Sequence, residues 1–277
     1  MKRFELFSIG AVLLSAVCAA LCYPPGSMRY LTGDPNIQAS TLPSGVGIWL
    51  KAEDITVNTG TVITNWPDSS GNNWEASRTS VNPPGVSSNV LNGFNVVEND
   101  NQDGLDWVDS EARDLFKNAE AATVFIVAKP TSVSAGYPVL FFVSQGDAGY
   151  PPRFDLRYAA SAFEIEGSRL DSDSVKASDY FTLPLNTWYI FEAIASWTNS
   201  DALLWTNGVA AIADTSWGTA GNTSDTTPQA MTIGTYAHQS GETWVGQIAE
   251  VIIYNRRLTT DELDQIRVYL NGKFEIY

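Results

Sequence analysis

Alternation of apolar and polar side chains is clearest in the last fifth of the chain. The run at residues 245–254 is apolar at nearly every position. A strand that is apolar on both faces belongs between two packed layers, so the pattern predicts a strand buried on both sides. Its two alternating sets are Ile248, Glu250, Ile252 and Tyr254, and Ala249, Val251 and Ile253.

A short amphipathic helix is predicted directly after this strand. Thr259 and Glu262 have the spacing of a capping box, in which each side chain bonds the other residue's backbone N–H. Leu263, Ile266, Tyr269 and Leu270 then recur at helical spacing, and Gly272 lies where a helix commonly ends. We expect this helix to cap the layered domain.

Upstream, apolar runs alternate with turn signals at intervals typical of a β-sandwich. Asn207-Gly208 is a strong signal for a two-residue hairpin turn, and a short helix is expected at 111–117. The pattern therefore predicts an all-β domain. The expected strands are residues 45–52, 62–66, 123–129, 138–143, 153–158, 162–166, 188–195, 202–206 and 231–234.

The first 22 residues differ from everything that follows. Lys2 and Arg3 precede an apolar run that ends at Cys22, which is the layout of a secretory signal peptide; the alternative is a retained apolar arm. Residues 23–44 are rich in Pro, Gly, Ser and Thr and are predicted to be a linker, with the domain at 45–277. Cys18 and Cys22 are the only cysteines, so removing residues 1–22 leaves no disulfide, thiolate nucleophile or cysteine metal site.

Two motifs near opposite ends of residues 45–277 resemble one family. Gly246-Gln-Ile-Ala-Glu-Val-Ile-Ile-Tyr-Asn-Arg256, with Tyr269-Leu-Asn-Gly-Lys273, resembles the end of a laminin-G-like, concanavalin A-like lectin/glucanase domain. Trp-x-Asp-x-Ser-Gly-Asn at 66–72 is similar to a motif near the start of the same family. The resemblance implies a jelly-roll β-sandwich of two antiparallel sheets, but it implies no activity by itself.

A third family feature is altered here. The resemblance leads us to expect Leu-Asn-Gly, a strand, and then an aromatic-Asp-Gly turn. Leu91-Asn92-Gly93 is present, but Asn99-Asp100-Asn101 stands where that turn is expected. A function that depends on the aromatic-Asp-Gly turn is therefore not implied for this chain.

Charge narrows the range of partners. The chain has 277 residues, of which 31 are acidic and 16 basic, for a formal net charge of −15. Such a surface repels phosphate backbones and anionic lipid, so we expect no nucleic acid and no membrane insertion of the mature domain. It suits a protein that is secreted or held at a cell surface, with a virion surface as the alternative.

No complete set of catalytic residues is recognisable. His238 is the only histidine, and no Gly-x-Ser-x-Gly motif occurs. Glycoside hydrolysis needs paired carboxylates, and related glucanases usually have three acidic residues at alternating positions of one strand. Glu164 and Glu166 supply two, but Ser168 occupies the third position. We predict no catalytic residues and expect the glutamates to lie on a solvated strand face.

Calcium is the metal that the sequence favours. Calcium takes oxygen ligands from carboxylates, amides and backbone carbonyls, so it needs neither cysteine nor histidine. Residues 99–103 form the densest acidic and amide-rich loop of the chain. The candidate ligands are Asn99, Asp100 and Asp103, and the alternative is a merely polar turn.

Aromatic residues provide the candidate ligand site. Sugar rings stack on exposed aromatic faces, and the chain has nine tryptophans. Most of them lie in or beside predicted strands and are expected in the core. Trp217, Tyr236, His238 and Trp244 lie in or next to loops before the last strand, and we predict that they form a ligand-binding patch.

Three functions remain open from the sequence. The favoured one is a non-catalytic extracellular binding or adhesion module for a glycan or a cell-surface ligand, with calcium assisting. The second is a self-assembling structural or adhesive subunit of a surface layer, filament or virion fibre. The third is a polysaccharide-degrading enzyme that uses Glu164 and Glu166.

Overall fold

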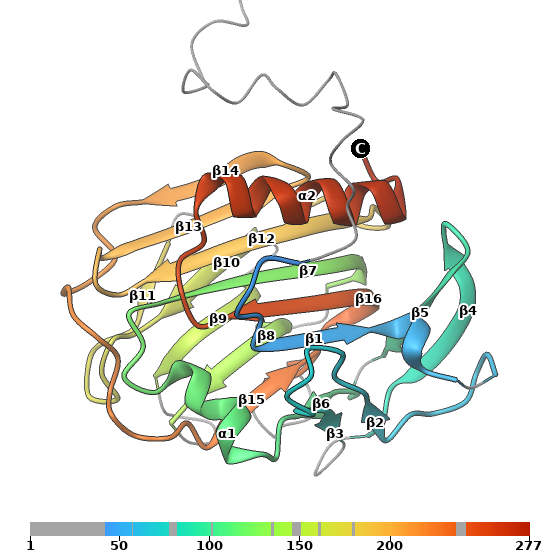
Figure 1. The fold of residues 1–277 in the computed structure, drawn as a ribbon, viewed down its shortest axis with the longest axis horizontal. Coiled ribbons are helices and arrows are strands. Elements are labelled where there is room, and N and C mark those ends of the chain that lie inside the picture. Colours follow the sequence, from blue (N-terminus) through green and yellow to red (C-terminus); the bar gives the residue numbers. More distant parts are fainter. Residues whose placement is uncertain are drawn as a thin grey trace, which may run out of the picture. The chain divides into compact units, whose positions relative to one another are not determined.

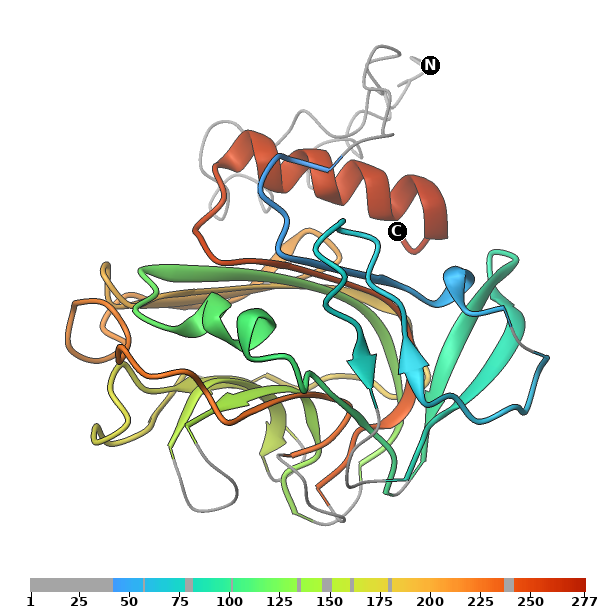
Figure 2. The same ribbon diagram turned by 60° about the horizontal axis from the view of Figure 1, so that its bottom comes forward.

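Two antiparallel sheets pack face to face in this protein, as Figures 1 and 2 show. The predicted all-β class, with a C-terminal helix, is confirmed. The structure is a computed structural model. It describes residues 42–56, 58–77, 82–100, 102–133, 136–145, 151–159, 162–178, 181–236 and 242–277.

The first sheet is built from β1 (Ile48–Lys51), β4 (Gly85–Leu91), β5 (Phe94–Asn99), β7 (Ala121–Ser132), β12 (Tyr189–Ser196), β13 (Asp201–Thr206), β14 (Val209–Asp214) and β16 (Val245–Tyr254). Their order is β14-β13-β12-β7-β16-β5-β4, and β1 also pairs with β16. The two longest strands, β7 and β16, therefore lie side by side near the centre, where long apolar strands are best buried.

The second sheet has the order β11-β10-β9-β8-β15-β6-β3-β2. Its strands are β2 (Asn65–Trp66), β3 (Ala76–Ser77), β6 (Leu105–Asp106), β8 (Val139–Ser144), β9 (Pro152–Ala159), β10 (Ala162–Gly167), β11 (Lys176–Ala177) and β15 (Ala230–Ile233). The helical elements are η2 (Ala52–Asp54), α1 (Ser110–Arg113), η3 (Asp114–Phe116) and α2 (Thr260–Phe274). One apolar core lies between the sheets, and a second lies between the first sheet and α2.

Strand β16 is buried on both faces as predicted, but its alternation differs from the expected one. A bulge interrupts its pairing with β7 between Ile248 and Glu250 and shifts the phase of the side chains. The core between the sheets receives Ile248, Val251 and Ile253, and the core under α2 receives Ala249, Ile252 and Tyr254. The sequence period could not reveal this extra residue, because both phases of the run are apolar.

Helix α2 begins as the sequence predicts and ends later. Thr259 accepts a hydrogen bond from the backbone of Glu262, whose carboxylate accepts from the backbone N–H of Thr259, completing the capping box. The predicted end at Gly272 is wrong, because the helix runs to Phe274. Glu275 then adopts the left-handed conformation (φ 53°) that commonly ends a helix. The two extra residues include Phe274, which is buried in the core under α2.

Helix α2 lies over the outer face of the first sheet (Figure 2). Two buried carboxylates of that sheet anchor it. Glu250 is fully buried and accepts hydrogen bonds from Lys273 (2.7 Å), Trp49 (2.6 Å) and Tyr269 (2.8 Å). Glu192 on β12 is held by Arg267 at 2.6 and 2.7 Å. Burial raises the pKa of Glu192 to about 7 although Arg267 opposes the shift, so this carboxylate depends on its partner.

The motif at 66–72 serves a structural purpose. Asp68 accepts hydrogen bonds from the backbone N–H groups of Trp49, Ser70 and Trp74 at 2.9 to 3.0 Å. One carboxylate therefore closes the turn after β2 and ties it to β1. The part of the motif that Asp68 supplies is therefore structural.

The predicted hairpin turn at Asn207-Gly208 is confirmed. Asn207 and Gly208 both have positive φ, at 53° and 73°, as a type I′ turn requires, and they join β13 to β14. The sequence predicted neither β14 nor β4, which pairs with β5, because both strands alternate weakly between apolar and polar residues.

Residues 1–41 lie outside the described part of the chain. The signal peptide at 1–22, with Cys18 and Cys22, and most of the linker at 23–44 therefore stay predictions. Among the described residues, no helix is both long and apolar enough to cross a membrane.

We predict that Arg267→Met lowers the free energy of unfolding by roughly 3–5 kcal/mol, because it leaves the carboxylate of Glu192 buried without its partner. Arg257→Met is the matched control. Its ion pair with Asp201 is half exposed, and such pairs contribute only about 0–1 kcal/mol. Denaturation in urea measures both values. Equal losses in the two variants would show that the Glu192 contact does not anchor α2.

Candidate functional site

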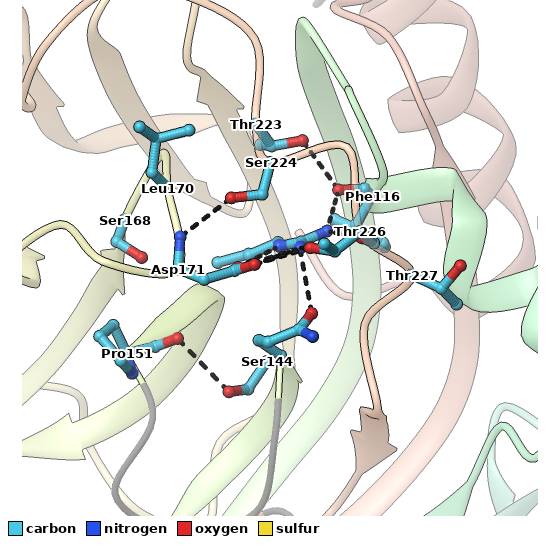
Figure 3. A network of polar contacts seen from close by, with 12 residues as sticks. Phe116, Ser144, Pro151, Ser168, Leu170, Asp171, Thr223, Ser224, Thr226 and Thr227 are labelled. Atoms are coloured by element: carbon cyan, nitrogen blue, oxygen red, sulfur yellow. Dashed lines mark hydrogen bonds and ion pairs between the residues drawn. The ribbon is translucent and has the colours of Figure 1, made fainter.

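A network of polar contacts joins the loops at one end of the sandwich (Figure 3), and a fully buried arginine organises it. Arg153 on β9 is 0% exposed. It donates to the carbonyl oxygens of Phe116 (2.9 Å) and Thr226 (2.8 Å), to the Thr226 hydroxyl (2.6 Å) and to Gln145, and it pairs with Asp171 at 2.9 Å. Because a buried guanidinium must have its donors satisfied, these contacts fix four separate segments around one side chain.

Further hydrogen bonds join those segments to one another. The backbone of Ser224 donates to the carbonyl of Arg169, and the Ser224 hydroxyl accepts from the backbone of Asp171 at 3.0 Å, as Figure 3 shows for the second contact. The Thr223 hydroxyl donates to the carbonyl of Phe116 at 2.9 Å. These contacts hold the long polar loop before β15 in place, and its residues Gly218 and Thr219 line the first of two cavities.

The first cavity, which we call the end pocket, has a volume of about 220 Å³ and opens between the ends of the two sheets. Gly167 has no side chain, and a Cβ there would lie 2.7 Å from the Trp217 ring, so this glycine makes room for the indole. The Trp217 Nε1 donates to the carbonyl of Lys176 at 3.0 Å. The lining includes Ser168, Arg169, Asp173, Lys176, Trp197 and Trp217.

The second cavity, which we call the side pocket, lies on the other side of the turn after β12 and has a volume of about 450 Å³. Its lining includes Lys117, Glu120, Ser196, Asn199, Arg256 and Arg257. Arg256 pairs with Glu262 and Arg257 with Asp201, so two of its cations are already neutralised. Ser196 and Trp197 are consecutive, so the two pockets share one strand end.

The predicted ligand patch is not brought together. Trp217 and Trp244 are only 4% and 1% exposed, so the expectation of two exposed indoles is wrong. Trp244 packs among Tyr158, Phe163 and Phe191 between the sheets. Burying its large apolar ring there is more favourable than leaving it in water. Trp217 remains a wall of the end pocket.

Tyr236 and His238 have different outcomes. Tyr236 packs on Phe142 with ring centroids 4.5 Å apart, on the outer face of the second sheet. That is the opposite face from Trp217, which belongs to the core between the sheets. His238 lies outside the described residues.

The predicted metal residues do lie together. Asn99, Asp100 and Asp103 line one groove of about 620 Å³ with Glu98. The Asn99 amide donates to the carbonyls of Asp103 and Gly234, and Asp103 accepts from the backbone of Asp100 at 3.0 Å. Burial raises the pKa of Asp103 to about 6; the hydrogen bond from the backbone N–H of Asp100 opposes the shift, and the Asp100 carboxylate adds to it.

These groups fit calcium only in part. In the described part of the chain, no three Asp, Glu, His or Cys side chains have a geometry suited to a metal ion. Calcium takes about six to eight oxygen ligands. A calcium ion in this groove would therefore depend on amide and backbone oxygens as well as on Asp100 and Asp103.

A second group of acidic residues surrounds Arg157 on the outer face of the second sheet. We call Asp155, Glu164 and Glu166 the acidic cluster. Arg157 lies 3.0 Å from Glu164 and 3.5 Å from Asp155, pairs with Glu166, and lies 4.7 Å from the ring centroid of Tyr137. The predicted solvated face is wrong, because Glu164 and Glu166 are 4% and 6% exposed.

Asp155 is the most perturbed member of the acidic cluster. It is 0% exposed, and neither carboxylate oxygen has a hydrogen-bond partner among the described residues. Burial raises its pKa to about 8; Arg157 opposes the shift, while Glu164 and Glu242 add to it. At neutral pH the native protein therefore holds Asp155 largely protonated.

Sequence reasoning missed most of the end pocket. Arg169, Lys176 and Trp197 were given no role, and they come from three different parts of the chain. The available signal was weak: the glycine at 167 interrupts a strand pattern, and basic residues are scarce in an acidic chain. Neither feature indicates which residues meet.

Comparisons with known proteins agree with the architecture. A family model described as the concanavalin A-like lectin/glucanases superfamily matches residues 100–264. No curated protein sequence matches the chain.

Solved structures are similar at low sequence identity. The sialidase of Trypanosoma rangeli in complex with sialic acid has a TM-score of 0.55 at 15% identity; the match covers 84% of this chain and 34% of that one. Domain 4 of AbnA, an extracellular arabinanase from Geobacillus stearothermophilus, in complex with arabinotriose, has a TM-score of 0.51 at 14% identity, covering 80% and 98%. The chain thus spans about a third of the sialidase, and these likenesses show the fold alone.

We predict that Asp155→Asn changes how stability depends on pH. Between pH 4 and 8 the native state keeps a proton on Asp155 that the unfolded chain, with its pKa near 3.8, releases. The free energy of unfolding of the wild type therefore falls with rising pH, by about 1.4 kcal/mol per pH unit from this group. Asp155→Asn removes that slope.

Chemical denaturation across this pH range measures the difference. The variant is expected to gain stability relative to the wild type as the pH rises. Asp225→Asn, which alters an exposed loop carboxylate, serves as the control. Parallel curves for the wild type and Asp155→Asn would mean that Asp155 is already ionised in the native state.

Proposed function

We propose that this chain, which belongs to the concanavalin A-like lectin/glucanase superfamily, is a non-catalytic extracellular module that binds carbohydrate or a carbohydrate-bearing cell-surface ligand. The end pocket is the site through which it binds. Secretion, in this proposal, follows from the apolar segment at residues 1–22.

The end pocket is the observation that carries the proposal. Sugars are bound by aromatic walls together with a few fixed hydrogen-bonding groups. Trp197 and Trp217 supply the walls, and Ser168, Arg169 and Lys176 supply polar groups. Its volume of about 220 Å³ is below the roughly 300–1,000 Å³ of drug-sized sites, so it suits a single sugar residue.

Fold likeness adds support from a protein of similar length. Domain 4 of the arabinanase AbnA, which this chain matches over 98% of that domain, was solved in complex with arabinotriose. A glycan ligand for the present chain is consistent with that complex. Identity of 14% carries no ligand specificity, so arabinan is one probe among several.

Hydrolysis is the second candidate, favoured by one observation. A largely protonated Asp155 beside Glu164 and Glu166 resembles the acid and base pair of a glycosidase. However, Arg157 holds both glutamates, and all three carboxyl groups are nearly or fully buried. These contacts favour a structural role for the acidic cluster, and with it a module without catalysis.

We predict that Ser174→Tyr abolishes glycan binding. Ser174 is an exposed residue of the end pocket lining, so a tyrosine there fills the mouth without disturbing the core. Native electrophoresis of the full chain through gels containing arabinan, dextran or carboxylated polysaccharides measures binding as retardation.

Ser132→Tyr is the control, because Ser132 is the last residue of β7 and lies outside the end pocket lining. This variant should still be retarded. Retention of binding by Ser174→Tyr would contradict the assignment of the end pocket. Free migration of the wild type in every gel would contradict carbohydrate binding altogether. Size-exclusion chromatography would then test the alternative, a self-assembling subunit of a surface layer, filament or virion fibre.

We also propose that calcium assists by binding at Asn99, Asp100 and Asp103, and predict that it raises the thermal midpoint of unfolding. A ligand at about a hundred times its Kd stabilises the native state by roughly 2.7 kcal/mol. Asp103→Asn should reduce this gain, whereas Asp201→Asn should not. Differential scanning calorimetry with calcium and with chelator measures it, and identical midpoints in the two conditions would remove calcium from the proposal.

A further inference from the structure

The end pocket is locally basic in a strongly acidic protein. Arg169 and Lys176 line it from either side, and Asp173 is its only acidic residue among the described lining. Lys176 is exposed and forms no ion pair within the described ranges. Against a net charge of −15, two cations at one small cavity are an unusual local excess.

The ion pair that would neutralise Arg169 is loose. Its Nε lies 3.8 Å from the Asp173 carboxylate, which is beyond hydrogen-bond distance. Asp173 is instead bound to its own turn, where it accepts from the backbone of Leu170 at 3.1 Å. The guanidinium edge of Arg169 is therefore not matched by the carboxylate beside it.

Two donors of the pocket lining lack acceptors. Trp197 is 2% exposed, and its Nε1 has no hydrogen-bond partner among the described residues. The Nε of Arg169 is likewise buried and unpartnered. Among the buried side-chain atoms of the described lining, only donors lack a partner, which favours an acceptor as the group that completes this site.

We propose that the end pocket binds the carboxylate of an acidic sugar, so that the ligand is a polysaccharide of uronic or other carboxylated residues. This inference rests on the proposed function and narrows it. A carboxylate is planar, accepts hydrogen bonds only, and matches the fork of an arginine side chain. Lys176 adds a second charge at the pocket mouth.

The overall acidity of the protein selects a sparsely charged ligand. Exposed charges more than about 8 Å apart are largely screened at physiological ionic strength, so distant carboxylates repel a ligand weakly. The pocket cations act at contact distance and are not screened in this way. A polymer with one carboxylate per sugar meets less repulsion than a nucleic acid, which carries a charge every 1.7 Å or so.

The test compares each acidic polymer with its own neutral derivative. Full-length protein is titrated with polygalacturonate, alginate, hyaluronan and polysialic acid, and with the methyl esters of the polymers that bind. Esterification removes the charge while keeping the backbone of the sugar. We expect binding to at least one acidic polymer and affinity at least about tenfold weaker for its ester.

Variants locate the charge. Lys176→Gln and Arg169→Gln should each weaken binding roughly ten- to hundredfold, the range expected for lost hydrogen bonds to a charged group. Lys129→Gln changes the net charge equally but lies on β7 over Trp188, outside the pocket lining, and should bind normally. An equal loss in Lys129→Gln would overturn the inference in favour of a net-charge effect.

The outcomes separate the two proposals. Equal binding of an acidic polymer and its ester, or of neutral glycans alone, overturns the carboxylate inference and leaves carbohydrate binding intact. Binding of dextran sulfate as tight as that of the carboxylated polymers overturns the choice of carboxylate over sulfate. Absence of binding to every glycan overturns both proposals.

Discussion

The need to satisfy one buried guanidinium shapes the functional end of this protein. Arg153 is fully enclosed, so each of its donors requires an acceptor at a fixed position. Phe116, Asp171 and Thr226 provide them from segments far apart in the chain. Holding these three segments together fixes the polar loop before β15, and two residues of that loop, Gly218 and Thr219, line the end pocket.

Buried charge is used in two contrasting ways in the two sheets. On the outer face of the first sheet, Glu192 and Glu250 each meet a cation of α2 at close range, so desolvation is offset and the helix gains a defined position. On the outer face of the second sheet, Asp155, Glu164 and Glu166 share one cation, Arg157, among the described residues. Burial raises the pKa of Asp155, and the charge of Glu164 adds to the shift, so Asp155 is held largely protonated there.

The small number of basic side chains also explains why the charge of the end pocket is distinctive. Most of the basic residues described above form close ion pairs with carboxylates; examples are Arg153, Arg157, Arg256 and Arg267. Lys176 and the loosely paired Arg169 are exceptions at a cavity with indole walls. Because no close ion pair neutralises these two cations, their charge is available for a ligand. The proposed acidic sugar would supply the carboxylate that they lack.

Local patterns in the sequence determined the longest strands, the C-terminal helix and one hairpin turn of this fold, because period, caps and turn residues act over a few neighbours. The apolar run of β16, the capping box at Thr259 and the turn at Asn207 all belong to this class. Burial of individual side chains and the make-up of the pockets were decided only by tertiary structure. Trp217, next to a polar loop in sequence, is enclosed because it packs against Gly167, 50 positions earlier, and it meets Arg169 and Trp197 only where the ends of two sheets converge. Such contacts depend on which strands become neighbours, and the periodicity of a short stretch of sequence carries no information about that.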